Sequence, residues 1–173
     1  MKIFVETERL ILRELLPSDA SGMLALDSNP SVLQFIGIQP ITDLLACKRS
    51  IRFVRDQYER NGIGRWAVTL KETQAFIGWS GLKFMDDVTI NNKSNFYDLG
   101  YRFLENYWGK GYGYEAAQAC VNYGLMNLAL PKISAHLDAR NEASRRILQK
   151  CGFQYINTFL EDSVPHDWME IER

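Results

Sequence analysis

The chain has few residues of the kinds that build metal centres or disulfide frameworks. Its 173 residues include three cysteines and two histidines. Cys47, Cys120 and Cys151 are odd in number and widely spaced, so they indicate neither a disulfide scaffold nor a metal-binding cluster. We therefore expect no metal site.

An excess of charge is also missing. Twenty basic and 21 acidic residues leave a net charge of −1, whereas a nucleic-acid-binding protein usually carries a clear basic surplus. No apolar run approaches the roughly 20 residues that a membrane-spanning helix needs. Charges interrupt the first ten residues, which is not typical of a signal peptide. These absences predict a cytoplasmic protein that binds neither nucleic acid nor membrane.

The chain does have enough apolar residues for one core. Hydrophobic residues make up 46% of it, and there is no repeat or linker, so we expect a single domain over residues 1–173. Apolar runs and period-two alternation predict seven strands, at 7–15, 65–70, 75–85, 95–104, 132–139, 153–160 and 168–172. Helical spacing and capping signals predict helices, at 17–26, just after 29–30, at 42–60, at 115–127 and at 141–151. This order predicts an α/β domain on a mixed sheet.

A glycine-rich segment, Gly109–Gly113, lies between a predicted strand and a predicted helix. Three glycines in five residues allow positive φ angles and close approach of a ligand to the backbone. The unpaired N–H groups and the dipole of the following helix favour an anion such as a pyrophosphate. The segment does not match the P-loop pattern, and its G-K-G-Y-G spacing differs from the G-x-G-x-x-G of dinucleotide-binding folds.

Three motifs, in this order along the chain, resemble those of the GNAT superfamily. The segment W-G-K-G-Y-G at 108–113 is similar to the family loop [Q/R]-x-x-G-x-[G/A], with Trp108 in place of the usual Gln or Arg. The opening T-E-R-L-I-L-R at 7–13 and N-E-A-S-R-R-I-L-Q-K-C-G-F at 141–153 resemble the RimJ/RimL-type branch. The resemblance covers nearly the whole chain. It implies a mixed, mostly antiparallel sheet of about seven strands, with helices on both faces and a splay between strands 4 and 5.

The resemblance also implies an activity. A GNAT enzyme transfers an acetyl group directly from acetyl-coenzyme A to a primary amine, which here is a protein N-terminal α-amine or a small-molecule amine. Relatives in the family often dimerise, so a homodimer is one arrangement that it allows. The backbone amides expected to hold the coenzyme A pyrophosphate are those of Lys110, Gly111, Tyr112, Gly113 and Tyr114.

Further cofactor contacts are implied at the splay. Phe103, Leu104 and Glu105 lie where the pantetheine arm pairs with strand backbone, and one amide near Phe103 would polarise the acetyl carbonyl. Asn141 matches a family asparagine whose side chain meets the pantetheine or the adjacent backbone. As a structural alternative, Asn141 is a good N-cap of the last helix.

The resemblance points less clearly to the groups that move protons. Ser144 matches a serine proposed to hydrogen-bond the leaving sulfur, whereas Leu148 occupies the place of the tyrosine that serves many relatives as general acid. Asp98 matches an acidic residue of the family strand motif and is our candidate base, directly or through water.

Other candidates for the base are Glu115, which suits a first helical turn, and the two histidines, His136 and His166. Because neither the acid nor the base is certain from these residues, a second function remains open. In that alternative the chain is a non-catalytic sensor or regulatory module that binds coenzyme A.

Overall fold

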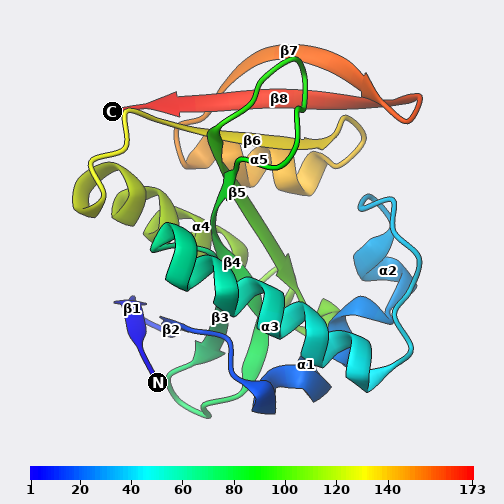
Figure 1. The fold of residues 1–173 in the computed structure, drawn as a ribbon, viewed down its shortest axis with the longest axis vertical. Helices are drawn as coiled ribbons and strands as arrows, with labels where there is room; N and C mark the ends of the chain where they lie inside the picture. The colour runs from blue at the N-terminus through cyan, green and yellow to red at the C-terminus, as the bar shows by residue number, and fades with distance from the viewer.

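The computed structural model describes all 173 residues, and its eight strands form one sheet (Figure 1). The strands are β1 Ile3–Glu6, β2 Leu10–Arg13, β3 Arg65–Leu70, β4 Phe76–Met85, β5 Phe96–Phe103, β6 Lys132–Asp138, β7 Gln154–Glu161 and β8 Val164–Glu172. The α-helices are α1 Ala20–Asp27, α2 Pro30–Leu33, α3 Leu44–Asn61, α4 Tyr112–Asn122 and α5 Glu142–Lys150. None of these helices has the length and apolar character that crossing a membrane requires.

The sheet has eight strands where the sequence predicts seven, because β1 precedes the first predicted strand, 7–15, which contains only β2. The turn between β1 and β2 is closed by the Thr7 N–H, which donates to the Leu10 carbonyl over 3.0 Å, and by the Leu10 N–H, which donates back to the Thr7 hydroxyl. β1 then pairs antiparallel with β2. The last strand, β8, also starts earlier than predicted, at Val164. The added residues let β8 pair with β7 along the full length of β7.

Helices cover both faces of the sheet, as expected. Successive side chains of a strand point to opposite faces, and β3 shows how this builds two cores. Trp66 and Val68 are buried with residues of α4 and α5, whereas Ala67 is buried with residues of α1 and α3. The larger core therefore lies under α4 and α5, and a smaller one lies under α1–α3.

The sheet parts between β5 and β6. Its order is β1-β2-β3-β4-β5-β6-β8-β7, and every neighbouring pair is antiparallel except β5 and β6. These two parallel strands share a single pair of residues, Asp98 and Ser134. In Figure 1, β6, β7 and β8 run across the top of the view, whereas β4 and β5 run down it. The expected splay between the fourth and fifth predicted strands is present, and it opens the backbone of β5 on one side.

Helix α4 begins at Tyr112, three residues before the predicted start, and ends in a π-helical turn over 123–127. Glycine disfavours helix interiors, but Gly113 lies in the first turn, where α4 packs closely on α5. A Cβ atom at Gly113 would lie 3.1 Å from the Ile147 Cδ1 atom. Close packing of the two helices explains why glycine is accepted there.

Candidate active site

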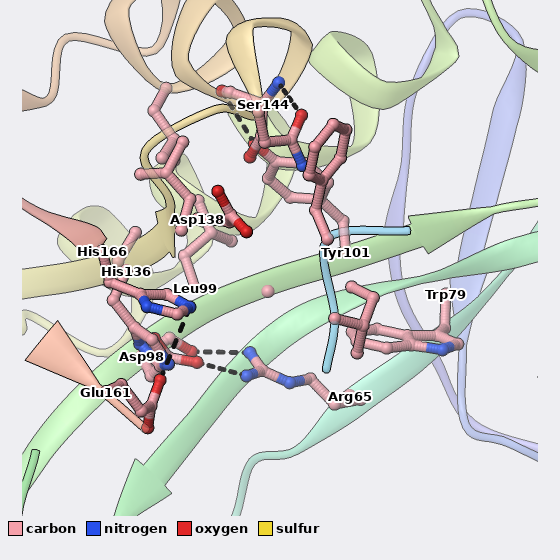
Figure 2. Close-up of a pocket in the computed structure, with 17 residues that line it drawn as sticks. Arg65, Trp79, Asp98, Leu99, Tyr101, His136, Asp138, Ser144, Glu161 and His166 are labelled. Carbon is pink, nitrogen blue, oxygen red and sulfur yellow. Dashed lines mark hydrogen bonds and ion pairs between the residues drawn. The ribbon is translucent and has the colours of Figure 1, made fainter. Parts of the chain in front are cut away.

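A cavity of about 250 Å³ opens where β5 and β6 part. Its lining comes from β3, β4, β5, β6, the β7–β8 hairpin, α5 and the segment after α2 (Figure 2). The lining side chains that carry ionisable or hydroxyl groups are Arg65, Asp98, Tyr101, His136, Asp138, Ser144, Glu161 and His166. Both histidines of the chain therefore face the same cavity.

Asp98 is buried at the base of this cavity, with only 4% of its surface exposed. The Arg65 guanidinium forms an ion pair with its carboxylate through Nη2, and Arg65 Nη1 donates to the Asp98 carbonyl over 2.6 Å. Burial alone would raise the pKa of Asp98, but the Arg65 charge and a hydrogen bond with His136 hold that pKa below its ordinary value. Asp98 is thus a charged carboxylate, and both of its oxygens have partners.

His136 is the second partner of that carboxylate. Its Nδ1 atom lies 3.2 Å from the Asp98 Oδ1 atom, and its ring stacks on Trp168 with centroids 6.2 Å apart. Burial lowers the pKa of His136, but the hydrogen bond and the charge of Asp98 raise it above the ordinary value of 6.5. The Nε2 atom makes no hydrogen bond within the chain. An imidazole oriented through one nitrogen, with the other free, can accept a proton in the cavity.

Ser144 lies on the opposite wall, in the first turn of α5. Its backbone N–H donates to the Asn141 side chain over 3.1 Å, so Asn141 is an N-cap as the sequence predicts. The Ser144 Oγ atom lies 2.9 Å from the hydroxyl oxygen of Tyr101, which reaches across from β5. Leu148 follows one turn later, is buried, and also lines the cavity.

The backbone amides of residues 110–114 form an anion cradle. Gly111 is the N-cap of α4, with φ +82°, and no side chain caps the helix. The first bond of the helix runs from the Glu115 N–H to the Gly111 carbonyl, and the five preceding N–H groups donate to no other residue of the chain. Unpaired donors at a helix N-terminus suit a phosphate or pyrophosphate, so the residues present fit the phosphates of coenzyme A.

The residues implied to contact the pantetheine arm are Phe103, Leu104 and Glu105. They differ in whether their backbone N–H is free to bind a ligand. The Leu104 N–H donates to the Ile77 carbonyl, so this amide is not free for a ligand, contrary to our expectation. Because antiparallel pairing alternates along a strand, the N–H of Phe103 points away from β4, toward the opening. The Glu105 carboxylate accepts a hydrogen bond from the Asn29 side chain over 3.1 Å.

Trp108, which departs from the family pattern, ties the loop to β5. Its indole N–H donates to the Phe103 carbonyl over 2.8 Å. Trp108 therefore anchors the start of the cradle beside the strand that lines the cavity.

Sequence reasoning missed two features of this site. Arg65, the ion-pair partner of Asp98, starts β3 and gave no signal by itself. The hydroxyl of Tyr101 was missed because an aromatic residue of a strand is more often part of the core. His136 was named as a candidate base, but its contact with Asp98 depends on strand register, because the pairing of Asp98 with Ser134 places His136 two residues further along β6.

Comparisons with known proteins show which family and which fold this chain resembles. Residues 9–154 match the family model described as an acetyltransferase (GNAT) domain. The uncharacterized N-acetyltransferase p20 of Bacillus licheniformis is 32% identical over 148 residues, which span 86% of this chain and 80% of that protein.

Two solved structures share the fold. A RimL ribosomal L7/L12 α-N-protein acetyltransferase in complex with coenzyme A has a TM-score of 0.80 at 13% identity, over 99% of this chain and 98% of that one. The spermidine N-acetyltransferase of Vibrio cholerae, in complex with coenzyme A and spermine, has a TM-score of 0.78 at 17% identity, over 96% of each chain.

Proposed function

Because the chain belongs to the GNAT acetyltransferase family, whose members transfer an acetyl group from acetyl-coenzyme A to an amine, we propose that His136 is the base that deprotonates the acceptor. The main observation that supports this proposal is the 3.2 Å contact between His136 Nδ1 and the Asp98 carboxylate. It leaves Nε2 free in the cavity where β5 and β6 part.

Asp98 acts in this proposal as a positioning residue. Its carboxylate is paired with Arg65, and its pKa is held low, so it is a weak proton acceptor. A carboxylate that orients a histidine and favours its protonated form makes that histidine a better base. Our expectation that Asp98 is the base is therefore replaced by one in which it acts through His136.

The donor enters from the other side of the cavity. The amides of residues 110–114 hold the pyrophosphate, and the pantetheine arm lies in the gap between β5 and β6, with Asn141 beside it. The N–H of Phe103 faces this gap and would stabilise the negative charge that develops on the acetyl oxygen. Leu104 takes no part through its amide, because that N–H is already bonded to Ile77.

The acceptor is a primary amine small enough to fit beside His136. At about 250 Å³, the cavity suits a small-molecule amine or the first residue of a peptide. Apolar walls of the cavity come from Phe35, Ile36 and Trp79, and Glu161 supplies a carboxylate. An amine that arrives as a cation is attracted by that carboxylate and must lose a proton before it can attack.

The test compares two histidines of one cavity. Acetyl transfer from acetyl-coenzyme A is measured for a panel that includes spermidine, a tripeptide with a free N-terminus and phenethylamine. For the amine that the wild type uses best, His136→Gln is expected to lower kcat/KM by about 100-fold or more, in the range of general-base catalysis. His166→Gln is the matched control and keeps kcat/KM within about threefold.

Two outcomes would contradict the proposal. If His136→Gln keeps the wild-type rate, the base lies elsewhere. If the wild type binds acetyl-coenzyme A but acetylates no amine in a wide panel, the chain is a coenzyme A-binding sensor.

A further inference from the structure

Three carboxylates line the cavity, and two of them are neutralised by an arginine of the chain. The three are Asp98, Asp138 and Glu161. Asp98 pairs with Arg65, and Asp138 accepts hydrogen bonds from the Arg140 Nε and Nη2 atoms over 2.9 and 2.6 Å. Asp98 and Asp138 are also buried, each with 4% of its surface exposed. Neither of these two has charge left over for a bound cation.

Glu161 differs from the other two because no lysine or arginine pairs with it. Its carboxylate accepts no hydrogen bond from the chain, and 40% of the side chain is exposed. The Nε2 atom of His166 lies 3.6 Å from this carboxylate, which is longer than a hydrogen bond. The His166 Nδ1 atom donates to the Val164 carbonyl over 3.1 Å. Glu161 is therefore the one carboxylate of the cavity that is free to bind a cation from outside.

The β7–β8 turn determines that Glu161 reaches the cavity. Glu161 pairs with Val164 at the last rung of the hairpin. The two turn residues, Asp162 and Ser163, have φ angles of +47° and +68°, as in the two-residue type I′ turn that suits a twisted hairpin. A turn of this type fixes the register of the two strands, and this register places both Glu161 and His166 in the cavity lining.

Glu161 is a separate contact point from His136. Strand β8 lies between β6 and β7, so the backbones of His136 and Glu161 are separated by two strand spacings, about 10 Å. The ring of His166 lies next to both, with its centroid 6.4 Å from that of His136 (Figure 2). Burial lowers the pKa of His136, whereas the charges of Asp98 and Glu161 raise it. The two side chains are thus neighbours that can contact two different amino groups of one acceptor.

Resting on the proposed function, we propose that Glu161 selects the acceptor, and that the acceptor is a small diamine with a second, cationic amino group. The neutral nitrogen beside His136 forms a bond to the acetyl carbon, the carbon–sulfur bond breaks, and its electron pair stays on the coenzyme A sulfur. The proton of the attacking amine goes to His136. The second amino group keeps its proton and pairs with the Glu161 carboxylate. Phe35, Ile36 and Trp79 supply apolar surface for the methylene chain.

The experiment compares diaminobutane with butylamine, an acceptor of equal chain length that lacks the second cation. After correction for its two equivalent amines, diaminobutane should have a kcat/KM about 10-fold higher in the wild type, the lower end for a hydrogen bond to a charged group because Glu161 is partly exposed. Glu161→Gln removes the charge and keeps the shape. It should raise the KM for diaminobutane by the same factor, leave kcat unchanged and abolish the preference over butylamine.

Three further measurements distinguish charge pairing from a structural role. Glu172→Gln is the matched control, because Glu172 is an exposed carboxylate of β8 outside the cavity lining, and it should keep the preference. Glu161→Asp keeps the charge and should also keep the preference. Added salt screens an exposed charge pair, so the preference of the wild type should shrink as the salt concentration rises, whereas Glu161→Gln should show no such dependence.

The outcomes separate this proposal from the assignment of the base. The preference is a ratio of two acceptors in one protein, so it stands if His136 is not the base. Equal use of the two acceptors by the wild type would overturn the role of Glu161, and so would a preference that survives in Glu161→Gln. Acetylation of a peptide N-terminus but not of diaminobutane would overturn the acceptor class. If no amine is acetylated, calorimetry of diaminobutane binding to the complex with coenzyme A decides. Weaker binding by Glu161→Gln then supports the site, and equal binding overturns it.

Discussion

The side chain of Glu115 in the first turn of α4 accepts hydrogen bonds from both the backbone N–H and the Nε of Arg9, 106 positions earlier in the chain. Thr7 donates a third hydrogen bond to the same carboxylate over 2.6 Å. Arg9 also donates through Nη1 to the Lys110 carbonyl over 3.0 Å. Two of the recognised motifs, T-E-R-L and the glycine loop, are thus joined by one half-buried carboxylate. The contacts of Glu115 and Arg9 therefore tie the start of β2 to the segment that we propose as the anion cradle.

Removing this charge should loosen the cradle. Glu115→Gln keeps the shape of the side chain but weakens its bonds to Thr7 and Arg9, so we expect unfolding to cost about 1–2 kcal/mol less. The dissociation constant for coenzyme A, measured by calorimetry, should rise several-fold. Glu6→Gln, whose charge pairs at the surface with Lys71, is the control and should change stability by less than about 0.5 kcal/mol. Unchanged affinity in Glu115→Gln would separate the Arg9–Glu115 contact from cofactor binding.

The same carboxylate gives a pH dependence with a definite sign. Burial raises the pKa of Glu115, but the bonds from Thr7 and Arg9 hold it below the ordinary value of 4.5. Its contribution to stability is therefore complete above pH 4.5 and is lost as the pH falls through the lowered pKa. Glu115→Gln should accordingly lose its stability deficit in acid.

A charge in the cradle should abolish cofactor binding. Gly111 has φ +82°, and a Cβ atom there would lie 3.3 Å from the Arg9 Nη2 atom. Gly111→Glu combines backbone strain with a negative charge among the amides that face the phosphates, so affinity for coenzyme A should fall by about 100-fold or more, equivalent to roughly 2.7 kcal/mol. A thermal-shift titration with coenzyme A measures the loss.

The control for that variant separates strain from charge. Gly37 has a similar φ of +74° and nothing near its Cβ position, so Gly37→Glu suffers comparable strain away from the loop. It should melt at a lower temperature yet bind coenzyme A normally. Tight binding by Gly111→Glu would mean that the loop does not hold the phosphates.

The pKa of His136 should depend on Asp98. In the wild type it lies above 6.5, because the hydrogen bond and charge of Asp98 outweigh burial. Asp98→Asn removes both, so the burial effect dominates and the His136 titration moves to lower pH. NMR titration can follow it directly, since His166 is the only other histidine and His166→Gln assigns the signals. An unshifted His136 in Asp98→Asn would break the proposed pair.

This pair also affects stability with pH. A folded pKa above 6.5 means that protonated His136 stabilises the fold below pH 6.5, and that this contribution disappears as the pH rises through the folded pKa. At neutral pH, Asp98→Asn should in addition destabilise the protein by about 3–5 kcal/mol, because it leaves the Arg65 charge buried without its partner, and this deficit should disappear in acid as the wild-type Asp98 takes up a proton.

Local patterns in the sequence predict most of the elements but not their ends. Alternation and glycine–proline signals locate the strands from 65 to 104, because each strand is bounded by polar turns. They place the start of α4 too late, since the tolerance of Gly113 depends on how closely α5 approaches. They miss β1, which lies before the predicted strand 7–15, and the turn that joins β1 to β2 is made by hydrogen bonds of Thr7 and not by a glycine or proline.

The family motifs predict the cradle better than they predict the proton-transfer groups. The proposed cradle consists of unpaired backbone amides at a helix start, and a glycine-rich segment before a helix predicts such an arrangement without knowledge of any side-chain contact. The contacts of Asp98 with Arg65 and His136, and of Tyr101 with Ser144, depend on strand register and on the angle between a strand and a helix. Neither quantity is written in local sequence, so Asp98, Ser144 and His136 were named as candidates, whereas Arg65 and the hydroxyl of Tyr101 were not.

The sheet as a whole is two smaller sheets that share one rung, the pairing of Asp98 with Ser134. Helix α4 and its amide cradle pack on the half that contains β2, β4 and β5, whereas His136, Glu161 and His166 belong to the half that contains β6, β7 and β8. If donor and acceptor are recognised by different halves, substitutions in the β7–β8 hairpin can change the acceptor while the donor site stays intact. With the donor and acceptor sites on different halves of the sheet, acceptor specificity can change during evolution while the acetyl-coenzyme A site is unchanged.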